Sequence, residues 1–226
     1  PDFKMPDREN MVIYEVLLRD FTVDKSLEAA ITKLDYLKKL GITAIELMPV
    51  HEFDGNESWG YNPNHFFAPD KAYGSPEMYK RFIDECHKRG IAVILDVVFN
   101  HATGIHPMAA LYWNAASSQT ASSNPWFNVT APHPYSVFHD FNHSYAPTRE
   151  HFKRVLQYWI EEYKIDGYRL DLTKGFTQKS SDESTASRYD QTRVDYLSEY
   201  YDAARAVKPD VMFILEHFCD YDEELA

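Results

Sequence analysis

The sequence predicts an α/β fold built on a parallel sheet, and two recurring features carry this prediction. Near-continuous apolar runs of strand length alternate with amphipathic segments of helix length, which is the pattern of parallel strand–helix–strand units. At Gly41 and again at Gly90, basic residues precede a glycine and a β-branched run follows it. Basic side chains suit the last turn of a helix, and glycine suits the position just after it.

Five strands and four helices are expected in order along the chain. The strands are expected at about 12–18, 42–48, 91–98, 166–172 and 211–216. Ser26 can cap the first helix, Ser75 the second, which has Pro76 in its first turn, and Thr148 the third. The first helix has an apolar stripe that comprises Leu27, Ala30, Ile31, Leu34, Leu37 and Leu40. A fourth helix is expected at about 190–207, and Cys86 is expected in the core.

Composition narrows the classes of partner. The 23 Lys and Arg against 35 Asp and Glu give a net charge of −12, which disfavours nucleic acid and anionic membranes as partners. A neutral small molecule or polymer fits better, and the 15% of aromatic residues include rings that suit sugar faces. Two cysteines are too few for a disulfide framework, and the absence of an apolar run of about 18 residues predicts no membrane span. Nothing in the sequence indicates a compartment.

Spacing predicts an insertion. The third and fourth expected strands lie much farther apart than the roughly 30 positions that one strand–helix unit of an eight-stranded barrel occupies. The surplus falls in 102–146, which follows the carboxyl end of a strand, where parallel α/β proteins build their sites. Residues 1–15 are expected to form a linker into the first strand. By spacing alone, the five strands could form an open sheet or part of a barrel.

The segment 167–176 carries an unusual pair of charges for a buried strand. Side chains alternate along a strand, so Arg169 and Asp171 share one face. A guanidinium beside a carboxylate favours the ionised carboxylate. The pair is therefore either a structural ion pair or part of a site.

Polar residues also end the strands on either side. The third strand delivers Asp96, Asn100 and His101 to the same edge, and the fifth delivers Glu216. An ionised carboxylate beside a second carboxyl group is the requirement of a retaining glycosidase, with Asp171 as nucleophile and Glu216 as acid. A metal site is the rival interpretation, because Asp, Asn and His are also metal ligands.

A family resemblance adds to this reading. The stretches DVVFNH (96–101), GYRLDLT (167–173) and ILEHF (214–218) resemble three consecutive signature strands of the α-amylase superfamily of glycoside hydrolases. VIYEVLLRDFT (12–22), WGYNPNHFFAPDKAYG (59–74) and HDFNH (139–143) resemble that family's first strand, second-strand loop and large-loop motif.

The resemblance implies a TIM-type (β/α)8 barrel of which this chain holds about the first five strands. Residues 1–226 would be a partial catalytic domain, with 102–146 as a small inserted subdomain. The implied activity is retaining cleavage or transfer on α-1,4-glucans such as starch, glycogen or malto-oligosaccharides. Branching, debranching or trehalose-releasing activity is an alternative within the family. A non-catalytic glucan-binding protein, or an inactive fragment that self-associates, is an alternative of another class.

The resemblance also assigns roles. Asp171 would be the nucleophile and Glu216 the general acid/base, with Arg169 orienting Asp171 and Asp96 supporting them. Substrate binding is implied for Tyr61, Trp59, His101, Lys174 and His217.

Calcium is implied only weakly. Asn100 occupies a position that often ligates a structural calcium in the family, but LTKG follows the nucleophile where calcium-binding members tend to have a histidine. No cofactor is expected to be required. The family's third catalytic carboxylate lies on a seventh strand, which is not in this sequence.

Overall fold

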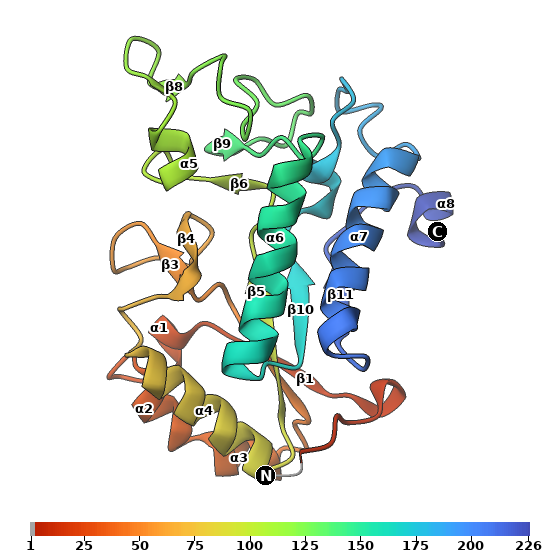
Figure 1. Ribbon diagram of the computed structural model, residues 1–226. Helices are drawn as coiled ribbons and strands as arrows, with labels where there is room; N and C mark the ends of the chain where they lie inside the picture. Colours follow the sequence, from red (N-terminus) through yellow and green to blue (C-terminus); the bar gives the residue numbers. More distant parts are fainter. Residues whose placement is uncertain (1–2) are drawn as a thin grey trace.

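The computed structural model describes residues 3–226 and contains one five-stranded sheet (Figure 1). Its strands are β1 (Ile13–Val16), β2 (Ala44–Leu47), β5 (Ala92–Val97), β10 (Gly167–Leu170) and β11 (Met212–Leu215). All neighbouring pairs are parallel, and the spatial order β1-β2-β5-β10-β11 follows the chain. The five expected strands are therefore confirmed, each shorter than its sequence pattern by a few residues. The order contains no reversal, unlike that of a doubly wound sheet.

One face of this sheet packs against the helices. Its residues include Ile45, Leu95, Val97, Tyr168 and Leu170, all buried in one core with apolar side chains of the helices. The main helices are α2 (Leu27–Ile31), α3 (Leu34–Lys39), α4 (Pro76–Lys88), α6 (Ala146–Tyr158), which continues as the π-helical turn η2 (Trp159–Tyr163), and α7 (Gln191–Val207). Shorter elements are η1 (Arg8–Asn10), α1 (Leu18–Phe21), η3 (Thr173–Phe176) and α8 (Tyr221–Glu224).

The helix starts agree with the sequence in two of three cases. Ser26 and Ser75 accept hydrogen bonds from the N–H groups of Ala29 and Met78, as expected of caps. Thr148 does not cap α6, because the helix begins at Ala146, and Thr148 is buried in its first turn.

Other expectations for the helices need smaller corrections. The first expected helix is two helices, broken between α2 and α3, and Leu40 lies beyond the second with 54% of its surface exposed. The fourth helix is confirmed and Asp190 caps it, while Cys86 is buried as expected.

The opposite face of the sheet is covered at its amino end by residues 3–11. Ala44, Ala92 and Ile94 form a small core there with Phe3, Met5 and other apolar side chains. Over the residues described, the segment expected to be a linker packs against the sheet. Toward the carboxyl ends of the strands, the same face carries charged residues, namely Glu15, Glu46, Asp96 and Arg169.

The segment 102–146 lies beyond the carboxyl ends of the strands, at the top of Figure 1. It contains α5 (Pro107–Ala110), β7 (Trp113–Asn114), β8 (Gln119–Thr120) and β9 (His139–Asp140). β9 pairs with β6 (His101–Ala102), which directly follows β5, so the segment is tied to the end of that strand. A second short pair, β3 (His51–Phe53) with β4 (Pro63–Pro69), lies in the connection after β2. Within residues 3–226, no helix is both long and apolar enough to cross a membrane.

Candidate active site

One guanidinium group connects the polar ends of three neighbouring strands. Arg169 Nη1 lies 3.0 Å from both carboxylate oxygens of Asp96 on β5, and 3.0 Å from Asp171 Oδ1 just beyond β10. Arg169 Nη2 lies 3.0 Å from Glu216 Oε2, at the end of β11. Burial acts to lower the pKa of Arg169, but the carboxylates of Asp96, Glu216 and Asp171 outweigh it and raise this pKa. A single fixed cation therefore faces three carboxyl groups.

Asp96 is the most deeply buried of the three carboxyl groups. It also accepts a hydrogen bond of 2.7 Å from the Tyr61 hydroxyl group. Burial raises the pKa of Asp96 to about 7, although the Arg169 guanidinium acts in the opposite direction. Burial and the neighbouring Asp96 raise the pKa of the Tyr61 phenol well above its usual value. Tyr61 therefore remains a donor, and its ring is fixed at the edge of the cluster.

The raised pKa of Asp96 predicts a pH dependence of stability. Between pH 4.5 and pH 8 the folded chain binds this proton more tightly than the unfolded chain, so the free energy of unfolding falls as pH rises. Asp96→Asn removes this titration. The free energy of unfolding of the wild type should therefore fall on going from pH 4.5 to pH 8, whereas the variant lacks this loss. We expect the difference, variant minus wild type, to be about 3 kcal/mol more positive at pH 8 than at pH 4.5. Urea unfolding of both proteins at the two pH values measures this difference, and a pH-independent difference would contradict the pKa.

Glu216 is held by a second donor from the neighbouring loop. The N–H group of Leu172 donates to Glu216 Oε2 at 2.9 Å. Leu172 has a φ of +43°, in the left-handed region that branched side chains rarely occupy, at a cost of about 1–2 kcal/mol. Such strain persists where surrounding contacts hold it, and it is frequent at functional sites. Here the strained residue directly follows Asp171 and points its N–H group at Glu216.

Asn100 is joined to Asp171 rather than free to bind a metal. Its Nδ2 donates to the Asp171 carbonyl oxygen at 3.0 Å and to Asp171 Oδ2 at 3.1 Å. Its side-chain oxygen faces Nδ1 of His101. An asparagine that binds calcium must present that oxygen to the ion.

The close groups of His, Cys, Asp and Glu side chains that could hold a metal lie elsewhere. Within residues 3–226, close groups of three His, Cys, Asp or Glu ligands occur at Glu15, Glu46 and Asp96 and at His217, Cys219 and Glu223. Neither group includes Asp171 or His101, the hydrogen-bond partners of Asn100. The observation that does not fit a calcium ion at Asn100 is that its amide nitrogen, which cannot bind a cation, is the atom directed at both oxygens of Asp171.

His101 lies in the same cluster and is bound to the protein through Nε2. Its Nε2 donates to the Tyr61 carbonyl oxygen at 2.8 Å, and the ring is 3% exposed. Burial lowers the pKa of His101 to about 4, so the ring is neutral near pH 7. A sugar hydroxyl would have to replace one of these protein contacts. The exposed ring of Phe138, 5.6 Å from the His101 ring, extends the cluster onto the segment 102–146.

The loop that carries Tyr61 depends on a glycine. Gly60 has a φ of +97°, and a Cβ atom there would lie 2.3 Å from the carbonyl oxygen of Pro49. Only glycine allows this approach, which brings Tyr61 over Asp96. Trp59, two residues before Tyr61, is 59% exposed, so its ring lies at the surface.

Two residues assigned to substrate binding by the resemblance use their polar groups elsewhere. Lys174 is 8% exposed, and its Nζ donates to Ser187 Oγ at 3.1 Å and lies over the Tyr135 ring. His217 contacts Thr173 through Nδ1 and Glu223 through Nε2. The structure thus joins seven of the ten candidate residues by direct hydrogen bonds or ion pairs and leaves Trp59, Lys174 and His217 outside that network.

Sequence reasoning missed three contacts of this site. The hydrogen bonds from Asn100 to Asp171 and from Tyr61 to Asp96 could not be read from residue types, although both donors belong to quoted motifs. The Leu172 N–H contact had no sequence signal, because leucine does not favour a positive φ. Glu15 and Glu46, which alternate with apolar residues in two strands, were also overlooked. Burial, together with the nearby Glu15 carboxyl group, raises the pKa of Glu46.

An arginine and three carboxyl groups meet at the carboxyl edge of a parallel α/β sheet, which is the edge where enzymes of this fold class build their active sites. The model of the alpha-amylase catalytic domain matches residues 20–145 and 133–226. The chain therefore belongs to the α-amylase family of glycoside hydrolases.

Relatives and solved structures agree with this assignment. Malto-oligosyltrehalose trehalohydrolase of Saccharolobus solfataricus is 34% identical over 80% of this chain and 32% of its own length. The chloroplastic isoamylase SU1 of Zea mays is 34% identical over 77% of this chain and 25% of its own. Pullulanase type I from Bacillus subtilis, solved with maltose, superposes with a TM-score of 0.72 at 26% identity, over 96% of this chain and 33% of the pullulanase. The chain thus spans about a third or less of each of them.

Proposed function

We propose that this chain is part of a retaining enzyme that cleaves or transfers α-1,4-glucans such as starch, glycogen or malto-oligosaccharides. The observation that carries the proposal is the bridging of Asp171 and Glu216 by one arginine at the ends of adjacent strands. In retaining glycosidases the two carboxyl groups lie about 5 Å apart. Contact with neighbouring nitrogens of one guanidinium group is compatible with that separation.

In the proposed reaction Asp171 is the nucleophile. Its carboxylate attacks the anomeric carbon while Glu216 gives a proton to the departing glycosidic oxygen, so one C–O bond forms and another breaks. In the second step Glu216 takes a proton from water, or from an acceptor sugar, which displaces Asp171. Arg169 and Asn100 hold Asp171 on both sides. Asp96 fixes Arg169, and Tyr61 offers its ring to the sugar.

The proposed substrate contacts are chosen by whether each candidate side chain is already bound within the protein. Tyr61, which is bound to Asp96, and the exposed Trp59 carry aromatic rings, and we propose that both stack on sugar. His101 is proposed to contact the reacting sugar after giving up its bond to the Tyr61 carbonyl oxygen. Lys174 and His217 are left out, because their polar atoms are already bound by Ser187, Thr173 and Glu223.

We further propose that the five strands are the first five of a (β/α)8 barrel and that 102–146 is its inserted subdomain. Support comes from the strand order, which follows the chain without reversal, and from the main helices, which pack on the same face of the sheet. Residues 1–226 would then form part of one catalytic domain.

The particular reaction within the family can be tested with the full-length protein. Incubation with amylose and with glycogen is followed by analysis of product chain length and linkage. Shorter oligosaccharides indicate hydrolysis, new α-1,6 branches indicate branching, released linear chains indicate debranching, and trehalose from end-modified maltodextrins indicates a trehalohydrolase. Unchanged glucans in all four assays would contradict the proposal and favour the non-catalytic alternative.

The contacts of Asn100 predict activity that does not depend on calcium. Dialysis of the full-length protein against EGTA is expected to leave kcat/KM within about twofold of the untreated value, because the Asn100 amide is hydrogen-bonded to both the carbonyl and the carboxylate oxygen of Asp171. Activity and thermal midpoint are measured before and after calcium is returned. A large loss that calcium reverses would show that an ion is needed.

The isolated 226 residues are expected to self-associate and to be inactive or nearly so. Along β11 the edge is unpaired in the structure, and a cavity of about 580 Å³ lies between this strand and α7, lined by Leu197, Tyr201, Phe213 and Leu215. Open strand edges and exposed apolar surface favour association. Light scattering after size exclusion measures the mass, and a monodisperse, active monomer would contradict both expectations.

A further inference from the structure

A buried ion pair lies directly behind the loop that follows β11. Arg193 of α7 and Glu223 of α8 are 1% and 3% exposed. Arg193 Nε lies 2.6 Å from Glu223 Oε1, and Nη2 lies 2.7 Å from Oε2, so the pair is bidentate. The Asp190 N–H group also donates to Glu223 Oε2 at 2.6 Å. Burial acts to raise the pKa of Glu223, but Arg193 outweighs it and holds this pKa below its usual value.

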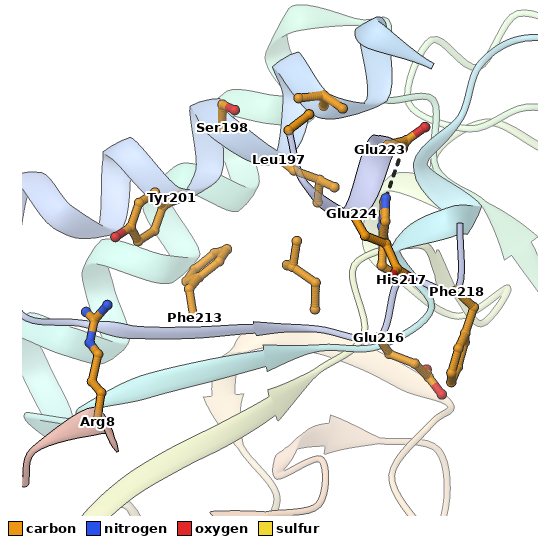
Figure 2. Close-up of a pocket in the computed structure, with 13 residues that line it drawn as sticks. Arg8, Leu197, Ser198, Tyr201, Phe213, Glu216, His217, Phe218, Glu223 and Glu224 are labelled. Atoms are coloured by element: carbon orange, nitrogen blue, oxygen red, sulfur yellow. Dashed lines mark hydrogen bonds and ion pairs between the residues drawn. The ribbon is translucent and has the colours of Figure 1, made fainter. Parts of the chain in front are cut away.

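The charged pair fixes the orientation of His217. His217 Nε2 lies 2.9 Å from Glu223 Oε1, and Figure 2 shows the imidazole between the end of β11 and α8. Glu216 and His217 point to opposite sides of the chain there. Burial lowers the pKa of His217, so the ring is neutral near pH 7. Because Glu223 is an acceptor, the neutral ring carries its proton on Nε2 and leaves Nδ1 as an acceptor.

Thr173 completes the connection to the proposed acid. Its hydroxyl group donates to His217 Nδ1 at 2.8 Å. The Thr173 N–H group donates to the Glu216 carbonyl oxygen at 2.9 Å, and the hydroxyl oxygen lies 3.1 Å from the same atom. The preceding residue, Leu172, gives its N–H group to the Glu216 carboxylate. The loop 172–173 therefore holds Glu216 at both its main chain and its side chain.

We propose that Glu223 is a positioning residue for Glu216 and acts through His217 and Thr173. The inference rests on the proposed function, since it concerns the residue assigned there as general acid. Glu223 does not touch the sugar site, and its contribution is to keep the strained loop and the Glu216 carboxyl group in one geometry. A displacement of about 1 Å at a reacting group can cost about 10²-fold in rate.

A metal site is the competing interpretation of the same residues. His217, Cys219 and Glu223 place ligand atoms within 4.8 Å of one another. Both oxygens of Glu223 are already bound by the Arg193 guanidinium, whose fixed positive charge opposes a cation at that place. The hydrogen-bonded chain therefore accounts for the cluster better than a metal does.

The first test is Glu223→Gln in the full-length protein, with Glu224→Gln as the matched control. Glutamine keeps the volume but points an amide N–H at Arg193 or His217, while Glu224 is exposed on the same helix. Comparing kcat/KM on two substrates distinguishes a loss of general-acid catalysis by Glu216 from a loss of the whole active site. A malto-oligosaccharide needs a proton on its leaving oxygen, whereas fluoride leaves α-maltosyl fluoride largely without one.

We expect Glu223→Gln to lower kcat/KM on the malto-oligosaccharide about 10- to 100-fold. On α-maltosyl fluoride we expect kcat/KM within about threefold of wild type, and Glu224→Gln unchanged on both. Equal losses on the two substrates, or no loss on either, would overturn the proposal. If instead Glu216→Gln cleaves the malto-oligosaccharide as wild type does, the proposed function itself fails, which is a different outcome.

A second pair of variants covers the case in which Glu223→Gln does not fold. Thr173→Val has the same shape but no hydroxyl, so His217 loses its donor while the buried ion pair remains. We expect a selective loss of about 10-fold on the malto-oligosaccharide, and recovery to within about twofold in Thr173→Ser, which restores the hydroxyl. A valine variant with wild-type activity, or a serine variant as impaired as valine, would contradict the connection through Thr173.

Discussion

Asp171→Asn is expected to abolish turnover by the full-length protein, with kcat falling about 10⁴-fold or more. An amide is too weak a nucleophile to form the glycosyl–enzyme bond, although it has nearly the size of the carboxylate and can still accept a hydrogen bond. The residue is held by Arg169 at 3.0 Å and by Asn100 at 3.1 Å, so the variant should fold with the amide in the same place. Both malto-oligosaccharide and α-maltosyl fluoride should be affected alike, because each needs the nucleophile.

The control for this result is Asp195→Asn, on the exposed side of α7, which should have wild-type kinetics. Asp171→Asn removes one negative charge from the Arg169 cluster and should leave the fold intact. Thermal unfolding of the variant, measured beside its kinetics, checks this. Wild-type turnover in Asp171→Asn would falsify the assignment of the nucleophile, and with it the proposed covalent mechanism.

Glu216→Gln is expected to separate the two substrates. On a malto-oligosaccharide, loss of the proton donor should lower kcat/KM about 10²- to 10⁴-fold. On α-maltosyl fluoride the same variant should lose less than about tenfold. kcat/KM is the quantity to compare, because it reports the steps up to formation of the glycosyl–enzyme and omits the later step in which Glu216 acts as base.

The contacts of Glu216 indicate that Glu216→Gln should remove the proton donor without disturbing the rest of the site. Glutamine can still accept the Leu172 N–H bond and lie beside Arg169, so the arrangement around Asp171 should be kept. A variant that loses activity equally on both substrates would indicate that Glu216 serves binding or structure rather than proton transfer. Enzyme with Glu216→Asp, which shortens the acid, should fall between wild type and the amide on the malto-oligosaccharide.

Most of the fold was accessible from the sequence because its signals are local. Apolar β-branched runs located all five strands, and the basic residues with glycine located the ends of the helices before β2 and β5. Thr148 misled because a threonine before an amphipathic stretch looks like a cap, whereas Pro147 in the first turn lets α6 begin earlier. Leu40 followed the helical period but lies just past the end of α3, where its side chain is exposed.

The sequence located the residues of the site but not their contacts. Alternation along β10 placed Arg169 and Asp171 on one face, and family motifs located Asp96, Asn100, His101 and Glu216 at neighbouring strand ends. Their partners could not be obtained in this way. His217 is adjacent to Glu216 in sequence, yet it points to the other side and binds Glu223, because successive residues at a strand end face opposite directions.

By itself the sequence determined the strand–helix order, the family, and which side chains reach the carboxyl edge of the sheet, since all of these depend on residue type and spacing. Only the tertiary structure decided that one guanidinium serves three carboxyl groups, that Asn100 is occupied by Asp171, and that a buried Arg193–Glu223 pair lies behind Glu216. Those contacts join residues up to about seventy positions apart. Their existence depends on register, burial and the left-handed conformation of Leu172, for which leucine carries no local preference.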